Sequence, residues 1–258
     1  MDAPTYSAGQ AFSPDILSRY SRQTAFAGLG IEGQKKLLRS RAVVIGVGAL
    51  GTFITERLCR AGLGFIRLID RDIVDMVNLH RQTLFTEDDA LQKKPKAMAA
   101  AGHLAAINST VTLEPIIANV DDSNIEAFVS GADIVLDGSD NLELRFLINE
   151  TCHKNRVPWV YGGAIAASGA CMSIIPDGPC FRCLCPLPEP DSQPNFNTDG
   201  IVNMIPAIVA CLEVTEAVKI LTCPDSLSKK YIAIDLWKNS IEYITILKNP
   251  RCPVCGRN

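Results

Sequence analysis

Several features of common protein classes are missing from this sequence of 258 residues. Residues 1–12 contain neither a basic segment nor an apolar core, so the pattern gives no secretory signal. The longest apolar stretch, around Met204 to Leu212, is far too short to cross a bilayer. The formal net charge of -3 gives no general attraction to nucleic acid or to anionic membranes. We therefore expect a cytoplasmic protein that has neither a membrane nor a nucleic-acid partner.

Disulfide-like spacing is also missing, although the chain contains 10 cysteines. Six of them lie mostly in apolar surroundings, which is typical of buried free thiols in a reducing compartment. These six are Cys59, Cys152, Cys171, Cys185, Cys211 and Cys223. The other four form two Cys-x-x-Cys pairs, Cys180 with Cys183 and Cys252 with Cys255.

The two cysteine pairs predict a metal site. Two thiolates three positions apart can bind the same ion, and a second pair completes a tetrahedron, which is the ligand set of a closed structural zinc site. One pair alone would equally suit a redox centre. We expect all four cysteines to bind one zinc ion and to tie the end of the chain to its middle, so that metal binding contributes to folding.

The first half of the chain alternates short apolar runs with helical patterns, which favours βαβ units and a parallel sheet. The expected strands are 41–46, 65–70, 111–117, 132–137 and 157–161, and the expected helices are 50–61, 88–107, 123–129 and 142–154. After residue 168 the pattern favours strands at 170–175, 231–236 and 240–247 and a helix at 202–221. The prediction is an α/β Rossmann-like fold whose mixed, mainly parallel sheet is extended by antiparallel strands.

A glycine-rich turn, Gly46-Val-Gly48-Ala49-Leu-Gly51, directly follows the first expected strand. Such a turn lets the backbone approach phosphates and presents a helix N-terminus to them. Asp70 ends the next strand, where a carboxylate can accept hydrogen bonds from ribose hydroxyls. The pattern suits NAD, FAD and ATP sites alike, and a turn that only packs is the alternative.

Charged residues downstream discriminate between these nucleotides. The β and γ phosphates of ATP require cations and usually Mg²⁺, and Arg81 and Lys96 follow the second expected strand. Asp140 lies just past the carboxyl end of another strand, where α/β sheets bind ligands. Taken singly, each cation would be a surface charge and Asp140 would be a helix N-cap. Together they indicate an adenylation site.

At this point the sequence resembles the ThiF/MoeB/HesA family, the bacterial relatives of ubiquitin-activating enzymes. The similarity runs from Arg19 to Cys255 and consists of ordered motifs. These are Arg19-Tyr-Ser-Arg22-Gln23, Gly30-Ile-Glu-Gly-Gln-Lys-Lys-Leu, the glycine turn, Asn78-Leu-His-Arg81-Gln82, Lys94-Pro-Lys96, Asp137-Gly-Ser-Asp140-Asn141, Gly178-Pro-Cys180-Phe-Arg-Cys183, Glu216-Ala-Val-Lys-Ile-Leu and Cys252-Pro-Val-Cys255-Gly256.

The resemblance implies one adenylation domain over residues 1–258. Within it, 13–40 would be an N-terminal helical segment, 41–165 the nucleotide-binding half, and 166–258 the antiparallel extension with the zinc site and a crossover loop. The implied ATP-binding residues are Gly46, Gly48, Ala49, Gly51, Asp70, Asn78, Arg81, Lys96, Asp140 and Asn141. Asp70 would hold the ribose, and Asn78, Arg81 and Lys96 would hold the triphosphate. Asp140 would coordinate Mg²⁺, and Arg22 would act across a homodimer.

The implied reaction is adenylation of a C-terminal carboxylate with release of pyrophosphate. The substrate would be a small β-grasp carrier protein ending in Gly-Gly, for sulfur transfer in the biosynthesis of a thiamine- or molybdopterin-type cofactor, with a possible sulfur-donor protein as a further partner. Arg22, Arg81, Lys96 and Asp140 would be the catalytic residues, and electrostatic stabilisation would suffice because a carboxylate nucleophile needs no general base.

One departure from the family concerns the acyl acceptor. Several members carry a cysteine in the loop after the first cysteine pair, and this chain has Phe196 at that position and no cysteine between Pro186 and Ala210. We therefore expect an acyl-adenylate that stays bound until an external nucleophile attacks it. Cys185 is the one alternative acceptor that the loop offers.

Three further alternatives remain open at this stage. A peptide-modifying enzyme of a natural-product pathway would use the same adenylation chemistry. An NAD-dependent oxidoreductase would share the nucleotide-binding half, although Arg81 and Lys96 oppose it. A non-catalytic scaffold subunit would share the fold, but it would have no need of Arg22, Arg81, Lys96 and Asp140 together.

Overall fold

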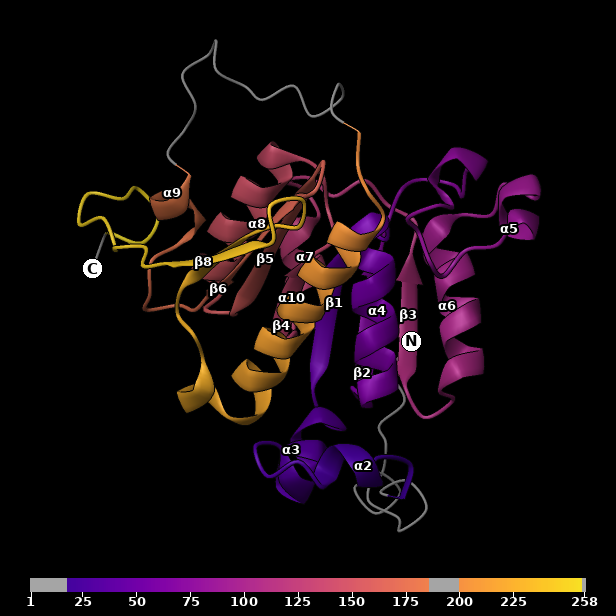
Figure 1. The fold of residues 1–258 in the computed structure, drawn as a ribbon, viewed down its shortest axis with the longest axis horizontal. Helices are drawn as coiled ribbons and strands as arrows, with labels where there is room; N and C mark the ends of the chain where they lie inside the picture. The colour runs from indigo at the N-terminus through magenta and orange to yellow at the C-terminus, as the bar shows by residue number, and fades with distance from the viewer. Residues whose placement is uncertain (1–17, 186–199, 257–258) are drawn as a thin grey trace.

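The computed structural model describes residues 18–185 and 200–256. Its strands form one sheet in the order β3-β2-β1-β4-β5-β6-β7-β8 (Figure 1). Strands β1 to β5 pair in parallel, and β6, β7 and β8 pair antiparallel. The strands are β1 Arg41–Ile45, β2 Phe65–Ile69, β3 Thr112–Ile116, β4 Ile134–Asp137, β5 Trp159–Ile165, β6 Ser168–Ile174, β7 Tyr231–Asp235 and β8 Ser240–Ile244. The predicted fold class is confirmed.

Helices cover both faces of the sheet, with α4, α6 and α10 on one face and α7 and α8 on the other (Figure 1). None of the described helices is long and apolar enough to cross a bilayer. The helices are α2 Ser21–Thr24, α3 Gly30–Leu37, α4 Ala49–Ala61, α5 Glu87–Leu91, α6 Lys96–Ile107, α7 Ile125–Val129, α8 Leu142–Lys154, α9 Phe181–Leu184 and α10 Met204–Thr222, with 3-10 turns η1 Met76–Asn78 and η2 Pro224–Ser226.

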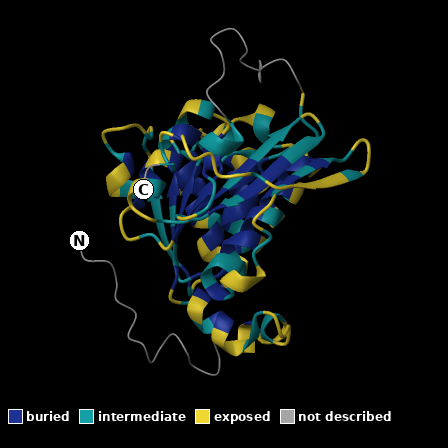
Figure 2. Ribbon diagram, turned by 90° about the vertical axis from the view of Figure 1, so that its left-hand side faces the viewer, coloured by how far each residue is buried: buried dark blue, intermediate teal, exposed yellow. Residues whose placement is uncertain are grey.

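The continuous apolar runs of the central strands follow from burial on both faces. In β1, Ala42 and Val44 pack into the core under α4 and α10, while Val43 and Ile45 pack into the core under α7 and α8. Parallel strands covered on both sides need apolar residues at every position rather than at alternate ones. Figure 2 shows the buried residues gathered in the sheet and on the inner sides of the helices.

The strand order fixes where a ligand can bind. The chain proceeds outward from β1 through β2 to β3 and then returns to place β4 on the other side of β1. The connections that leave β1 and β4 therefore diverge, and the carboxyl ends of these two strands border a crevice, as in other open α/β sheets. The glycine turn follows β1, and Asp140 follows β4.

Three of the predicted elements need correction. The strand predicted at 240–247 is shorter, because β8 ends at Ile244, the last residue that pairs with β7. The helix predicted at 88–107 is wrong as a single element, because α5 ends at Leu91 and α6 begins at Lys96. Lys93 adopts a positive φ of 50° between them, and Pro95 precedes the first residue of α6. The strand predicted at 157–161 continues as far as Ile165, because β5 pairs with β6 over its whole length.

The break between α5 and α6 is organised by a buried carboxylate, Asp89. It forms a capping box with Thr86. Its Oδ1 lies 2.9 Å from Nζ of Lys94, and its Oδ2 lies 2.7 Å from Nε2 of His103. Burial alone favours the neutral acid, but the hydrogen bonds from Lys94, His103 and Thr86 outweigh it and hold the pKa of Asp89 well below its usual value. This cluster fixes the approach to Lys96.

Replacing Asp89 with Asn should lower the free energy of unfolding by about 1–3 kcal/mol at pH 7, because it removes the charged acceptor of a buried network. The native pKa is below the unfolded value of about 3.9, so the carboxylate stabilises the fold fully above that pH and loses its contribution as the pH falls further. Urea unfolding at pH 7 and at a series of pH values down to pH 3 measures both effects.

The exposed neighbour Asp88 supplies the matched control, and Asp88→Asn should change stability much less. Equal stabilities for Asp89→Asn and the wild type at pH 7 would contradict the role given to Asp89. A difference that does not shrink below pH 4 would contradict the link to its ionisation.

Candidate active site

An open cavity of about 1940 Å³ lies at the carboxyl ends of the parallel strands and extends over β5 to β8. Pockets for one small molecule usually have volumes of roughly 300–1000 Å³, so this cavity has space for more than one substrate. Eight of the predicted nucleotide-binding residues line it, and they are Gly46, Gly48, Ala49, Asp70, Arg81, Lys96, Asp140 and Asn141.

Glycines bring two turns of the site into backbone contact. Gly46 has a φ of 90°, which favours glycine, and its carbonyl oxygen lies where a β-carbon on either Gly51 or Gly138 would be. The turn after β1 therefore packs directly on the turn after β4. Gly51 does not line the cavity, and its predicted place in the motif is explained by this packing.

The N-terminus of α4 opens into the cavity with its first amides uncapped by any side chain. Its N-cap, Gly48, makes no side-chain cap hydrogen bond, and a β-carbon there would meet no atom closer than Nε2 of Gln82 at 3.8 Å. Uncapped amides and the helix dipole suit an anion. The buried Oε1 of Gln82 has no partner among the described residues, which leaves a further polar atom beside this turn.

Asp70 connects the second strand to the glycine turn. One of its carboxylate oxygens accepts from the amide of Val47 at 2.7 Å, and the other accepts from the amide of Asp72 at 2.8 Å. Burial raises the pKa of Asp70, and these two amides and the charge of Lys96 oppose the rise. The carboxylate thus fixes the turn and still faces the cavity, where a ribose hydroxyl could reach it.

The two predicted phosphate ligands are each held by a neighbour. Lys96 is 6% exposed, and its Nζ lies 2.9 Å from the carboxylate of Asp72. Nη2 of Arg81 donates to Oδ1 of Asn78 at 2.8 Å. Asn78 does not line the cavity, so the structure places it behind Arg81 rather than beside a ligand. Sequence reasoning missed Asp72, although its position two residues after Asp70 was visible.

The turn after β4 carries Asp140, whose carboxylate has no hydrogen-bond or ion-pair partner among the described residues. Asn141 caps α8 by accepting from the amide of Leu144 at 3.0 Å, so its side-chain oxygen is already used. Asp140 is exposed to the cavity and forms no hydrogen bond or ion pair with the described residues. A free carboxylate beside a phosphate-sized space fits a Mg²⁺ ligand, since this ion prefers oxygen donors.

A buried ion pair that sequence reasoning did not identify supports this turn. Nε of Arg145 lies 2.8 Å from the carboxylate of Asp137, whose other oxygen accepts from the amide and hydroxyl of Ser139. Arg145 also donates to the carbonyl oxygens of Ser139 and Gly162. The pair links β4, α8 and β5 directly under Asp140. The only signal was an arginine one turn into the helix after the strand.

Arg22 lies outside the cavity, on α2, which lies at the opposite end of the parallel strands from the cavity. It is exposed on α2, where the neighbouring Gln23 donates to the carbonyl oxygen of Ala61 at the end of α4. The start of α4 is at the cavity, and a helix of this length spans about 20 Å. Figure 1 shows α2 beyond the end of the sheet that lies away from the start of α4, so Arg22 is far from the cavity of its own chain.

The thiol of Cys185 lies at the cavity wall. It is half-buried, and burial raises its pKa, so the neutral thiol predominates at pH 7. This environment does not favour a nucleophilic thiolate. Phe196, the predicted replacement for the acyl-accepting cysteine, lies outside the described residues.

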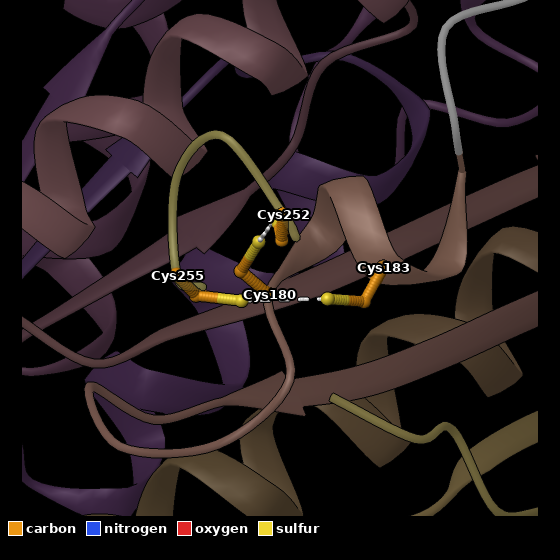
Figure 3. A group of neighbouring side chains, drawn as sticks. All are labelled: Cys180, Cys183, Cys252 and Cys255. Carbon is orange, nitrogen blue, oxygen red and sulfur yellow. Dashed lines mark hydrogen bonds between the residues drawn. The ribbon is translucent and has the colours of Figure 1, made fainter. Parts of the chain in front are cut away.

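The four predicted zinc ligands converge at the end of the chain, against α9 (Figure 3). All four sulfur atoms lie within 4.8 Å of one another, with 3.6 Å between Cys180 and Cys252 and 3.4 Å between Cys183 and Cys255. Tetrahedral zinc with bonds of about 2.3 Å separates its sulfur ligands by about 3.8 Å. The geometry of the four thiols therefore fits the expected ion.

The two members of the second cysteine pair differ in their pKa, because burial raises the pKa of Cys255 whereas that of Cys252 is lowered. Burial alone would raise the pKa of Cys252, but the amides of Cys255 and Val254 outweigh it and lower that pKa to about 7. The amide of Gly256 closes this turn on the carbonyl oxygen of Cys252, and a β-carbon at position 256 would press on the backbone of Cys252 and Pro250. The turn thus holds the two sulfur atoms close together and favours the thiolate at Cys252, and a bound metal ion would favour it at the other ligands as well.

Comparisons with known proteins agree with this geometry. The ThiF family matches residues 20–254. The SAMP-activating enzyme E1 of Haloferax volcanii is 39% identical over 242 residues, covering 93% of this chain and 89% of that protein. The sulfur carrier protein ThiS adenylyltransferase of Bacillus subtilis is 40% identical over 244 residues, covering 93% and 72%. The crystal structure of E. coli MccB with MccA-N7isoASN matches with a TM-score of 0.82 at 25% identity, covering 95% of this chain and 76% of that one.

The chain therefore belongs to the ThiF family. It is an adenylyltransferase of the ThiF/MoeB type, as the ordered motifs predicted.

Replacing Cys252 with Ser should remove bound zinc and lower the melting temperature, because one ligand of the tetrahedron is lost and three thiols remain in a poor site. Metal analysis by mass spectrometry and thermal unfolding with and without a chelator measure the two effects. Cys211→Ser, which changes an exposed cysteine of α10, is the control and should keep one zinc per chain. Purified wild-type protein without zinc, or an unchanged Cys252→Ser protein, would refute the site.

Proposed function

We propose that the protein uses ATP to adenylate the C-terminal carboxylate of a small β-grasp sulfur carrier protein ending in Gly-Gly. The observation that carries this proposal is the shape of the cavity. One end has the features of a nucleotide site, and the other end runs across four strands of the sheet. Its similarity to the SAMP-activating and ThiS-adenylating enzymes supports the same substrate class.

At the nucleotide end, each residue has a distinct proposed task. The amides at the start of α4 and the cations Arg81 and Lys96 would hold the phosphates, and Asp70 would hold the ribose. Asn78 orients Arg81, as their hydrogen bond indicates. Asp140 would bind Mg²⁺, which supplies charge neutralisation to the phosphates. Gly46 and Ala49 shape the phosphate end, and Asn141 holds the turn that presents Asp140.

The other end of the cavity, which we call the outer arm, suits an extended polypeptide. Paired residues that face the cavity cross β5 to β8 as a row, consisting of Gly163, Ala170, Ala233 and Glu242. Directly opposite residues in an antiparallel pair share one face of the sheet. The first three are small, so the floor of the arm is low, while Tyr161 and Tyr231 line the cavity beside it. A tail ending in Gly-Gly fits such a floor.

The chemistry needs no base. A carboxylate oxygen of the carrier attacks the α-phosphorus of ATP, the new carboxyl–phosphorus bond forms, and the bond from this phosphorus to the bridging oxygen breaks. Pyrophosphate leaves with that oxygen and its electron pair. Negative charge increases on the phosphate oxygens, and Arg81, Lys96 and the α4 amides are placed to stabilise it. With no thiolate favoured at Cys185, the acyl-adenylate would await an external nucleophile, such as sulfide delivered by a donor protein.

The family also leads us to propose a homodimer in which Arg22 acts in trans and residues 1–258 form one adenylation domain. The position of α2 supports this, since Arg22 lies near the end of α4 that points away from its own cavity. A second subunit could bring it to the phosphates. Zinc at the four cysteines would have a structural role.

A peptide substrate is the second candidate. The similarity to MccB in complex with MccA-N7isoASN favours it, and an outer arm that accepts a carrier tail would also accept a free peptide. Exchange of radioactive pyrophosphate into ATP in the presence of either substrate class distinguishes them. A carrier protein that supports exchange far below the concentration needed for its isolated tail peptide would support the first proposal.

Asp140→Ala should reduce carrier-dependent ATP–pyrophosphate exchange by roughly 10²–10³-fold, the usual cost of one preorganised charge at a reaction centre. Arg81→Ala and Lys96→Ala should show losses of the same order. Glu87→Ala, which changes an exposed carboxylate of α5 outside the cavity, is the control and should keep most activity. Exchange at the wild-type rate by Asp140→Ala would refute its role as the metal ligand.

Mixing inactive Arg22→Ala chains with inactive Asp140→Ala chains should restore about a quarter of wild-type exchange, because half of the dimers are mixed and each has one complete site. Differently tagged chains, purified as the mixed dimer, provide the sharper measurement. A pure mixed dimer without activity, or a fully active Arg22→Ala enzyme, would contradict action across the interface.

A further inference from the structure

The outer arm ends at an acidic side chain that none of the described residues neutralises. Glu242 is the last residue of the row that crosses β5 to β8, it lines the cavity, and it is exposed. It forms no hydrogen bond or ion pair with the described residues. The other carboxylate of the arm, Asp235, is engaged by the Nζ of Lys238 at 3.1 Å and by the amide of Lys238 at 3.0 Å.

Among the described residues, this difference leaves one net negative charge at the entrance of the arm. In the part of the chain that the structure describes, Lys238 is the cation that lines this end of the cavity. Its ammonium group is already paired with the carboxylate of Asp235. Ser168 and Ser240, the cross-strand neighbours of Asp235, carry no charge. Whatever passes over β8 on its way to the nucleotide therefore meets a negative charge on a floor of otherwise small or neutral side chains.

The spacing of the strands gives the distance between that charge and the nucleotide end of the cavity. The nucleotide end of the cavity includes the turn after β4, and β8 is four strands further along. Adjacent strands lie about 4.8 Å apart, which gives a path of about 19 Å. An extended chain covers about 3.3 Å per residue, so about six residues separate the reacting carboxylate from Glu242.

We infer that Glu242 is a specificity-determining residue that favours carriers with Lys or Arg at the fifth to seventh residue from their C-terminus. The inference rests on the proposed function, since it concerns the same tail in the same cavity. A basic residue at that point gains an exposed ion pair with Glu242, and an acidic residue is repelled. The contact lies far from the reacting atoms and is equal in the ground and transition states, so it changes KM and leaves kcat unchanged.

The test uses a β-grasp carrier protein that supports exchange and that carries Lys, Ala or Glu at each of these three positions in turn. With the wild-type enzyme, the Lys carrier should have a KM about fivefold below that of the Glu carrier at one position, with equal kcat. Glu242→Lys should reverse the order of the two carriers, and Glu242→Gln should abolish the difference. The preference should weaken in 0.5 M NaCl, because surface charges are screened.

Asp225→Lys is the matched control, because it reverses an exposed charge outside the cavity and should keep the wild-type preference. Carriers that differ less than twofold in KM at all three positions, or a preference that persists unchanged in Glu242→Lys, would overturn the inference while exchange itself still supported the proposed function. Absence of exchange with every carrier would instead overturn the proposed function and this inference with it.

Discussion

The carbonyl oxygen of Gly46 is the point on which the geometry of the site depends. It lies against Gly51 and Gly138 at distances that leave no space for a β-carbon on either. The turn that begins α4 and the turn that presents Asp140 consequently cannot shift independently of each other. The helix amides that suit phosphates and the carboxylate that suits a metal ion are held in register by backbone packing, before any ligand contributes.

Beneath this contact, buried cations are matched with their own carboxylates. Lys96 pairs with Asp72, and Arg145 pairs with Asp137. Burying an unpaired cation would be costly, whereas a paired one is tolerated and keeps a fixed orientation. Both cations line the cavity, but their other contacts differ. Arg145 also donates to the carbonyl oxygens of Ser139 and Gly162 and so fixes the shape of the turn, while Lys96 makes its one ion pair with Asp72 and is placed to meet a phosphate. Preorganised charge of this kind stabilises a transition state without further rearrangement.

The buried strands and the cysteine cluster could be predicted from the sequence because the patterns that indicate them are local. Apolar runs of about five residues predicted the buried strands, and the two cysteine pairs predicted the cluster of four sulfur atoms. The prediction of one helix at 88–107 was wrong because it followed the alanine-rich composition. Two local signals, the capping box at Thr86 and Pro95 before α6, indicate two separate helices instead. Asp72 and Arg145 were missed because their importance arises from pairing across elements, which no local pattern reports. The role proposed for Glu242 depends on the cross-strand register, which places it in the row that faces the cavity. In the sequence, an exposed glutamate on an edge strand cannot be distinguished from any other surface charge.

The cysteine cluster determines which part of the fold would loosen first if a bound metal ion were removed. Joining Cys183 to Cys252 through a metal encloses α10, β7 and β8 in one loop, and closing a loop of this length removes about 4 kcal/mol of entropy from the unfolded chain. Strands β1, β2 and β4, with the glycine turn, lie outside the loop. Demetallation would therefore loosen first the half of the outer arm that β7 and β8 form, while β5, β6 and the strands around the glycine turn would keep their packing.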